Sequence, residues 1–199
     1  MKKAKVFRIA LSALFAALLA VMAFTPLGYI PTGAFNITLM FLPVIFGAIA
    51  IGPTAGAVLG LLFGLTSFLQ AFGIGFIIDP MASVLFEISP LYYTLVCFVP
   101  RIVMGLLVGL IFKGMKRIDR TKTQVPSYAV ASISAVVLNT SLFMTGYYLA
   151  YRSTALAETP VNVVIMSALS LNSLCELLVA LLIGTPASMA IVHAMRKMK

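Results

Sequence analysis

The chain has 199 residues, of which 62% are hydrophobic and only 10% are charged. Soluble domains are about 45–50% apolar and about 25% charged, so a water-soluble fold is excluded and the solvent must be lipid. The formal net charge of +9 does not indicate nucleic-acid binding, because the basic residues gather beside apolar runs, chiefly in residues 2–8, 113–122 and 196–199. This pattern is typical of cytoplasmic segments next to anionic membrane lipid.

Six apolar segments follow one another along the chain, separated by proline, glycine and charged residues. About 20 residues are needed for one crossing. The predicted membrane helices span residues 6–24, 36–51, 54–72, 91–112, 126–149 and 163–192.

An even number of crossings places the N-terminus, the basic 113–122 loop and the C-terminus on one side of the membrane. The positive-inside rule makes that side the cytoplasm. The sequence therefore predicts one all-α integral membrane domain over residues 1–199, a multi-pass protein of the cell membrane with both termini cytoplasmic.

Small residues repeat every four positions in three of these helices. Gly56, Gly60 and Gly64 share one face of the third helix, and Gly105 and Gly109 repeat the spacing in the fourth. Such spacing lets helix backbones approach closely in lipid, and we expect these glycines to pack inside the chain.

The first helix carries a strip of alanines, among them Ala13, Ala16, Ala17 and Ala20. Packing within the chain and docking to another membrane subunit explain the strip equally well.

Two charged residues lie well inside predicted spans: Arg101 in the fourth helix and Glu176 in the sixth. A charge at that depth costs about 2.5–3.5 kcal/mol and usually has a function. The two opposite charges lie at similar depth and can pair. Asn139 and Asn172 lie at comparable depth, and Asn172 shares a helix face with Glu176. These four side chains predict a polar site between the last three helices.

Aromatic residues surround the outer end of this predicted site, and Asn36 is a further candidate at its mouth. The tyrosines that could wall the mouth are Tyr92, Tyr93, Tyr147 and Tyr148. Converging donors and acceptors beside rings favour a ligand pocket over a purely structural salt bridge. Arg101 suits a carboxylate or phosphate ligand, which it can bind through two parallel hydrogen bonds.

The sequence lacks a Walker A loop and the residue clusters of membrane hydrolases and metal enzymes. We therefore expect neither catalysis nor a bound metal or cofactor. Two alternatives to a nutrient-binding transport subunit remain. One is a stand-alone ion-coupled carrier with Glu176 as its proton site; the other, less favoured, is an integral-membrane enzyme.

The chain resembles the substrate-binding S components of energy-coupling-factor (ECF) transporters along nearly its whole length. The stretches that carry the resemblance are LPVIFGAIAIGP at 42–53, GAVLGLLFGLTS at 56–67 and VPRIVMGLLVGLIFK at 99–113. Weaker matches are LNT at 138–140 and the spacing of Asn172 and Glu176. Residues 25–70 and the Pro100-Arg101 pair look most like the pantothenate type, with the cobalamin type next.

This resemblance implies six helices, cytoplasmic termini and an outward-facing vitamin pocket capped by the loop between the first two helices. It also implies that the alanine motif of the first helix, here Ala13, Ala17 and Ala20, docks to a transmembrane coupling subunit. Two cytoplasmic ATPases would then supply the energy by using ATP, while this chain binds none.

Overall fold

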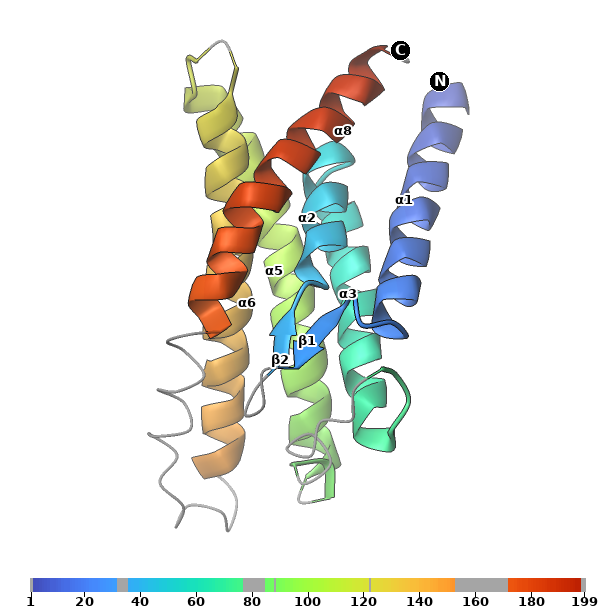
Figure 1. Cartoon of the computed structure of the whole chain (residues 1–199), viewed down its shortest axis with the longest axis vertical. Coiled ribbons are helices and arrows are strands. Elements are labelled where there is room, and N and C mark those ends of the chain that lie inside the picture. Colours follow the sequence, from blue (N-terminus) through green and yellow to red (C-terminus); the bar gives the residue numbers. More distant parts are fainter. Residues whose placement is uncertain are drawn as a thin grey trace.

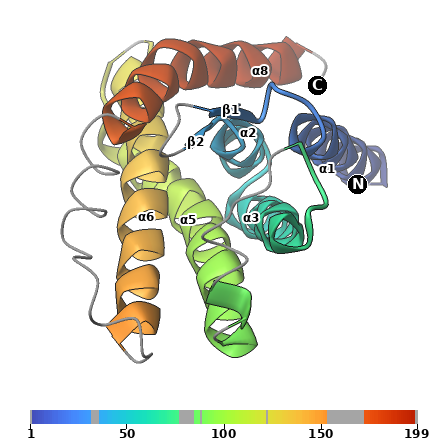
Figure 2. The same cartoon turned by 60° about the horizontal axis from the view of Figure 1, so that its bottom comes forward.

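The computed structural model describes residues 2–31, 36–76, 85–87, 89–121, 123–152 and 172–197. The chain is helical apart from one short two-stranded ribbon (Figures 1 and 2). Its elements are α1 (Lys2–Ala23), β1 (Tyr29–Pro31), β2 (Asn36–Thr38), α2 (Phe41–Ala50), α3 (Pro53–Leu69), the 3-10 turn η1 (Gln70–Phe72), α5 (Pro90–Ile118), α6 (Val125–Arg152) and a C-terminal helix over Asn172–Lys197. That last helix contains the π turn η3 (Ala180–Gly184) and ends as α8 (Thr185–Lys197).

Among the described residues, five helices are long and apolar enough to cross a membrane. These are the spans Val6–Ala23, Pro53–Phe72, Pro90–Ile118, Val125–Gly146 and Asn172–Lys197. The last of them corresponds to the predicted helix over 163–192, of which residues 163–171 lie outside the described part. Figure 1 shows both ends of the chain and the α5–α6 connection at the same end of the molecule.

The predicted second span, over residues 36–51, differs in the structure. Its first residues form β2, which pairs antiparallel with β1, and only the ten residues Phe41–Ala50 are helical. Ten residues rise about 15 Å, half the hydrocarbon thickness of a bilayer. Nine of the ten are buried, so α2 is a core helix that meets little lipid. Strand backbone at membrane depth is tolerated where protein surrounds it.

The hydrophobic core is centred on α2, which lies between α1, α3, α5 and the C-terminal helix (Figure 2). Phe41, Val44 and Ile45 from α2 are fully buried, together with Met104 and Val108 from α5. The turn between α2 and α3 needs Gly52, whose φ of 135° L side chains rarely adopt, and Pro53 then starts α3.

The predicted glycine packing joins α3 to α5. A Cβ atom built on Gly64 would lie 2.9 Å from the carbonyl oxygen of Cys97, and one on Gly109 would lie 2.6 Å from Cα of Pro53. Gly60 faces the backbone of Arg101 in the same way. The glycines therefore bring the two helix backbones into direct contact, as expected for packing within the chain.

The connection between α5 and α6 is organised by one carboxylate. Asp119 accepts hydrogen bonds from the hydroxyl and backbone N–H of Thr121, at 2.6 and 3.0 Å, and from those of Ser127 at 2.7 and 3.1 Å. These bonds, first those of Thr121, lower the pKa of Asp119 to about 2. The Ser127 N–H, in the first turn of α6, is shared between Asp119 and the carbonyl oxygen of Gln124, each at 3.1 Å.

Candidate functional site

The site begins with a proline inside α5. Pro100 has no backbone N–H, so the carbonyl oxygen of Val96, four residues earlier, loses its usual helical partner. The guanidinium of Arg101 supplies a donor instead, because its Nη1 donates to the Val96 oxygen at 2.6 Å. The sequence pair Pro100-Arg101 therefore fixes a cation against its own helix in the interior of the protein.

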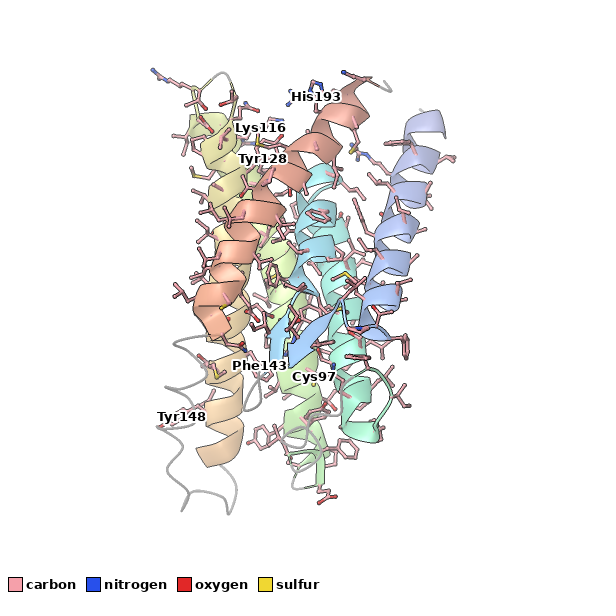
Figure 3. All side chains as sticks on the ribbon, in the orientation of Figure 1. Cys97, Lys116, Tyr128, Phe143, Tyr148 and His193 are labelled. Carbon is pink, nitrogen blue, oxygen red and sulfur yellow. The ribbon has the colours of Figure 1, made fainter. Side chains whose placement is uncertain are left out.

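Arg101 is 7% exposed and lies among aromatic rings. Its guanidinium carbon is 5.4 Å from the ring centre of Phe63 and 4.5 Å from that of Phe143, within the range of cation–π attraction. Figure 3 shows Phe143 at the level of the β1–β2 ribbon. The Nε of Arg101 is buried without a hydrogen-bond partner, so part of the guanidinium fork is unused.

The second buried charge, Glu176, takes its partner from the ribbon. Its Oε1 accepts the backbone N–H of Thr38, the last residue of β2, at 3.0 Å. Glu176 and Arg101 attract each other electrostatically. Their hydrogen bonds, however, go to backbone groups: Arg101 donates to a carbonyl oxygen and Glu176 accepts from an N–H. Among the described residues, the predicted pairing is thus a longer-range attraction and not a direct salt bridge.

The base of the ribbon spans the site. Tyr29 in β1 and Thr38 in β2 are paired strand partners. Thr38 meets Glu176 on one side, and the buried phenol of Tyr29 lies beside Ser67 and Gln70 of the α3–η1 segment on the other. Tyr29 also interacts electrostatically with Arg101.

Three of these positions carried no strong signal in the sequence. Tyr29 and Thr38 belong to a segment that reads as loop and helix start, and Gln70 reads as a helix end. Only the fold brings Thr38 to Glu176 and places Tyr29 beside Gln70 and near Arg101. A turn-rich stretch that holds an aromatic residue is the clue that the sequence offers.

Asn139 joins the site from α6. It lies one helical turn from Phe143, on the face that meets Arg101. Its side chain is buried and its Oδ1 has no hydrogen-bond partner; the same is true of the Tyr29 hydroxyl. Buried polar atoms are normally satisfied by protein, water or ligand. A cation with a free N–H, a phenol and an amide oxygen together suit a small polar ligand that carries a negative charge and a donor.

The remaining predicted site residues differ in how deeply they are buried. Asn172 is half-buried one turn before Glu176 on the same helix. Tyr92 is 38% exposed and lies outside the site, whereas its neighbour Tyr93 is 4% exposed and donates to the Ser67 carbonyl oxygen at 2.9 Å. The reason is helix phase: consecutive residues differ in direction by about 100°.

The side chains of Tyr147 and Asn36 lie outside the described part of the structure, although their backbones belong to α6 and β2. Tyr148 is 42% exposed and lies toward the far end of α6 (Figure 3). Within the described residues, no three His, Cys, Asp or Glu side chains gather so as to hold a metal ion.

The alanine strip of α1 is open to the surroundings. Ala13, Ala17 and Ala20 are exposed, while α1 packs on the core through Phe15 and Leu19. A furrow runs beside the strip between α1 and α3. Its two parts share Ala16 and Leu62, and its wider part, about 500 Å³, begins at Arg8. Packing within the chain, one of the two explanations of the strip, therefore does not explain why these three positions are alanine.

The chain is similar to known membrane transport proteins. Residues 7–188 match the family model "ECF transporter, substrate-specific component". The chain is also 30% identical to the pantothenic acid transporter PanT of Lactococcus lactis subsp. cremoris (strain MG1363), over 206 aligned positions that cover 99% of this chain and 97% of that protein. Both are transport proteins of the membrane and not enzymes. The chain belongs to the substrate-specific component family of ECF transporters.

Proposed function

We propose that this chain is the specificity subunit of an ATP-driven ECF importer, and that it binds pantothenate around Arg101. The observation that carries the proposal is the buried guanidinium, whose Nε has no partner, with unpartnered oxygens of Tyr29 and Asn139 in the same cluster. The similarity to a pantothenic acid transporter over almost the entire chain supports the choice of ligand.

The ligand chemistry fits these groups. Pantothenate carries a carboxylate, an amide and hydroxyl groups. A carboxylate can accept hydrogen bonds from the guanidinium fork of Arg101, and a ligand hydroxyl or amide N–H can donate to the Asn139 oxygen. The rings of Phe63 and Phe143 would wall the apolar part of the ligand. Cobalamin is the second candidate by resemblance.

Energy coupling would take place through α1. We place the end of the molecule that carries both termini and the basic α5–α6 connection in the cytoplasm, following the positive-inside rule. The exposed Ala13, Ala17 and Ala20 would receive a helix of the transmembrane coupling subunit, because small residues allow close helix contact in lipid. Two cytoplasmic ATPases complete the complex.

Calorimetry on the purified chain in detergent tests the ligand assignment, with pantothenate and cobalamin titrated separately. Loss of a charged hydrogen-bonded pair costs about 1.5–3 kcal/mol, so Arg101→Ala should weaken pantothenate binding by roughly 10- to 100-fold. Arg117→Ala, an exposed basic residue in the last turn of the same helix, is the matched control and should bind normally.

Equal pantothenate affinity in Arg101→Ala and the unaltered chain would remove Arg101 from the site. Binding of cobalamin alone would correct the ligand. Uptake by proteoliposomes that hold this chain without any ATPase would favour the stand-alone carrier.

A further inference from the structure

A hydrogen bond between residues 138 positions apart joins the β1–β2 ribbon to the C-terminal helix: the Thr38 N–H donates to the Glu176 carboxylate at 3.0 Å. We infer that Glu176 is a positioning residue, which holds the ribbon closed beside the bound ligand without contacting the ligand. The inference rests on the proposed function only in assuming that a ligand binds here, because the hydrogen bond itself is present in the free chain.

The direction of the Thr38 N–H explains why a helix side chain is needed. In a strand, successive N–H groups point to opposite sides. The next one, that of Leu39, points across the ribbon and donates to the Gly28 oxygen at 2.9 Å. The Thr38 N–H therefore points away from β1, as an edge donor without a strand partner. Such a donor needs an acceptor, and the Glu176 carboxylate supplies one in a part-buried position.

Glu176 is built to be that acceptor. It is 5% exposed, and a carboxylate accepts a backbone N–H more strongly than a neutral group does. Burial disfavours its charge, and the Thr38 N–H and the longer-range attraction of Arg101 offset part of that cost. The Thr38 hydroxyl accepts the Met40 N–H at 3.3 Å, whereas the bond to the carboxylate comes from the Thr38 backbone N–H.

The position of this bond gives it an effect on ligand retention. Thr38 pairs with Tyr29, and Tyr29 is one of the groups around Arg101. Release of Thr38 from Glu176 would therefore loosen the base of the ribbon where it borders the Arg101 cluster. Glu176 also repels a ligand carboxylate held by Arg101, so its charge opposes binding while its hydrogen bond favours retention.

These opposing effects allow a sharp test with two substitutions at one position. Glu176→Leu keeps side-chain volume and removes the acceptor. Glu176→Gln keeps an acceptor oxygen and removes the negative charge. The first measurement is hydrogen–deuterium exchange of the backbone amides of residues 36–39 in the ligand-free, full-length chain. Glu176→Leu should raise exchange there roughly tenfold or more, while Glu176→Gln should stay close to the unaltered chain.

The second measurement is the dissociation rate of pantothenate. We expect faster dissociation in Glu176→Leu, by roughly tenfold, and an unchanged or slower rate in Glu176→Gln. A residue that touched the ligand through its charge would instead lose affinity in both variants and leave the exchange of the ribbon unchanged. That result would overturn the inference, as would normal exchange in Glu176→Leu.

A backbone variant guards against misfolding at position 176. Thr38→Pro removes the N–H itself, at an edge position that does not donate to β1. It should reproduce the ribbon exchange of Glu176→Leu, and the double variant should add nothing further. Independent, additive effects would refute the pairing. Cys175→Ala is the control on the same helix and should change neither readout. If no vitamin bound at all, the exchange results would still stand and only the proposed function would fail.

Discussion

The glycine contact behind Arg101 allows one prediction to be worked through from the structure. In Gly60→Ala, the new Cβ would lie 2.8 Å from the carbonyl carbon of Arg101 and 3.2 Å from Cα of Ile102. Both neighbours are backbone atoms of α5, so no flexible side chain can move aside. The two helices must separate, and the backbone that carries Arg101 must shift with them.

The expected magnitude is the balance of two effects. Alanine favours the helix over glycine by about 1 kcal/mol. Overpacking of a close contact costs about 1–3 kcal/mol, and more where the backbone must move. We therefore expect Gly60→Ala to lower the free energy of unfolding by about 1–2 kcal/mol. Gly114→Ala is the matched control in α5, because nothing lies within 4 Å of its new Cβ, and it should gain about 0.5–1 kcal/mol.

The assay is thermal unfolding of both variants in the same detergent, with pantothenate binding measured in parallel. The resulting difference of about 1.5–3 kcal/mol between them corresponds to roughly 3–12 °C in Tm for a chain of this size. Gly60→Ala should also weaken ligand binding, since it displaces Arg101, whereas Gly114→Ala should not. Equal Tm values for the two variants would refute the close contact between α3 and α5 as a source of stability.

Three further changes test other parts of the molecule. Ala17→Phe alters an exposed face of α1, so it should abolish uptake in the assembled transporter while ligand binding by the isolated chain stays normal; lost binding would mean that the strip packs internally. Pro100→Ala restores a backbone N–H at position 100, and this N–H then competes with Arg101 Nη1 for the Val96 oxygen. Calorimetry should show weaker ligand binding, with an unchanged or higher Tm. Unchanged affinity would show that the bond from Arg101 to Val96 is dispensable. Asp119 has a pKa of about 2, below its ordinary value of 3.8, so its carboxylate stabilises the folded loop above about pH 4 and loses that effect as pH falls toward 2. Asp119→Asn should therefore speed proteolysis of the α5–α6 connection at pH 7. A difference between the variant and the unaltered chain that persisted at the lowest pH would contradict the charge as its cause.

Periodic features of the sequence predicted much of this structure. The spacing of Gly56, Gly60 and Gly64 depends only on helix geometry, and α3 uses that face against α5 as expected. Charge placement likewise depends on the membrane and not on packing, and the basic segments gather at one end of the molecule. Arg101 and Glu176 were recognised because a buried charge in a lipid-facing protein has few purposes other than function.

Residue contacts across the site could not be predicted in the same way. The choice between Tyr92 and Tyr93 depends on helix phase, and one residue of error turns a side chain from the site to the lipid. The sequence likewise contained no indication that Asn36–Thr38 leaves the helical register to pair with Tyr29–Pro31, because a short apolar run with β-branched residues fits either structure.

Composition, spacing and charge are properties of the chain alone, so they were enough to predict the lipid environment, the helical class, the family and the two buried charges. What those charges contact depends on how the chain folds. Arg101 binds the Val96 carbonyl that Pro100 leaves free, and Glu176 binds the Thr38 N–H on the β1–β2 ribbon. These partners are a backbone carbonyl and a backbone N–H, which nearly every residue possesses, so residue identity cannot mark them before the fold brings them together.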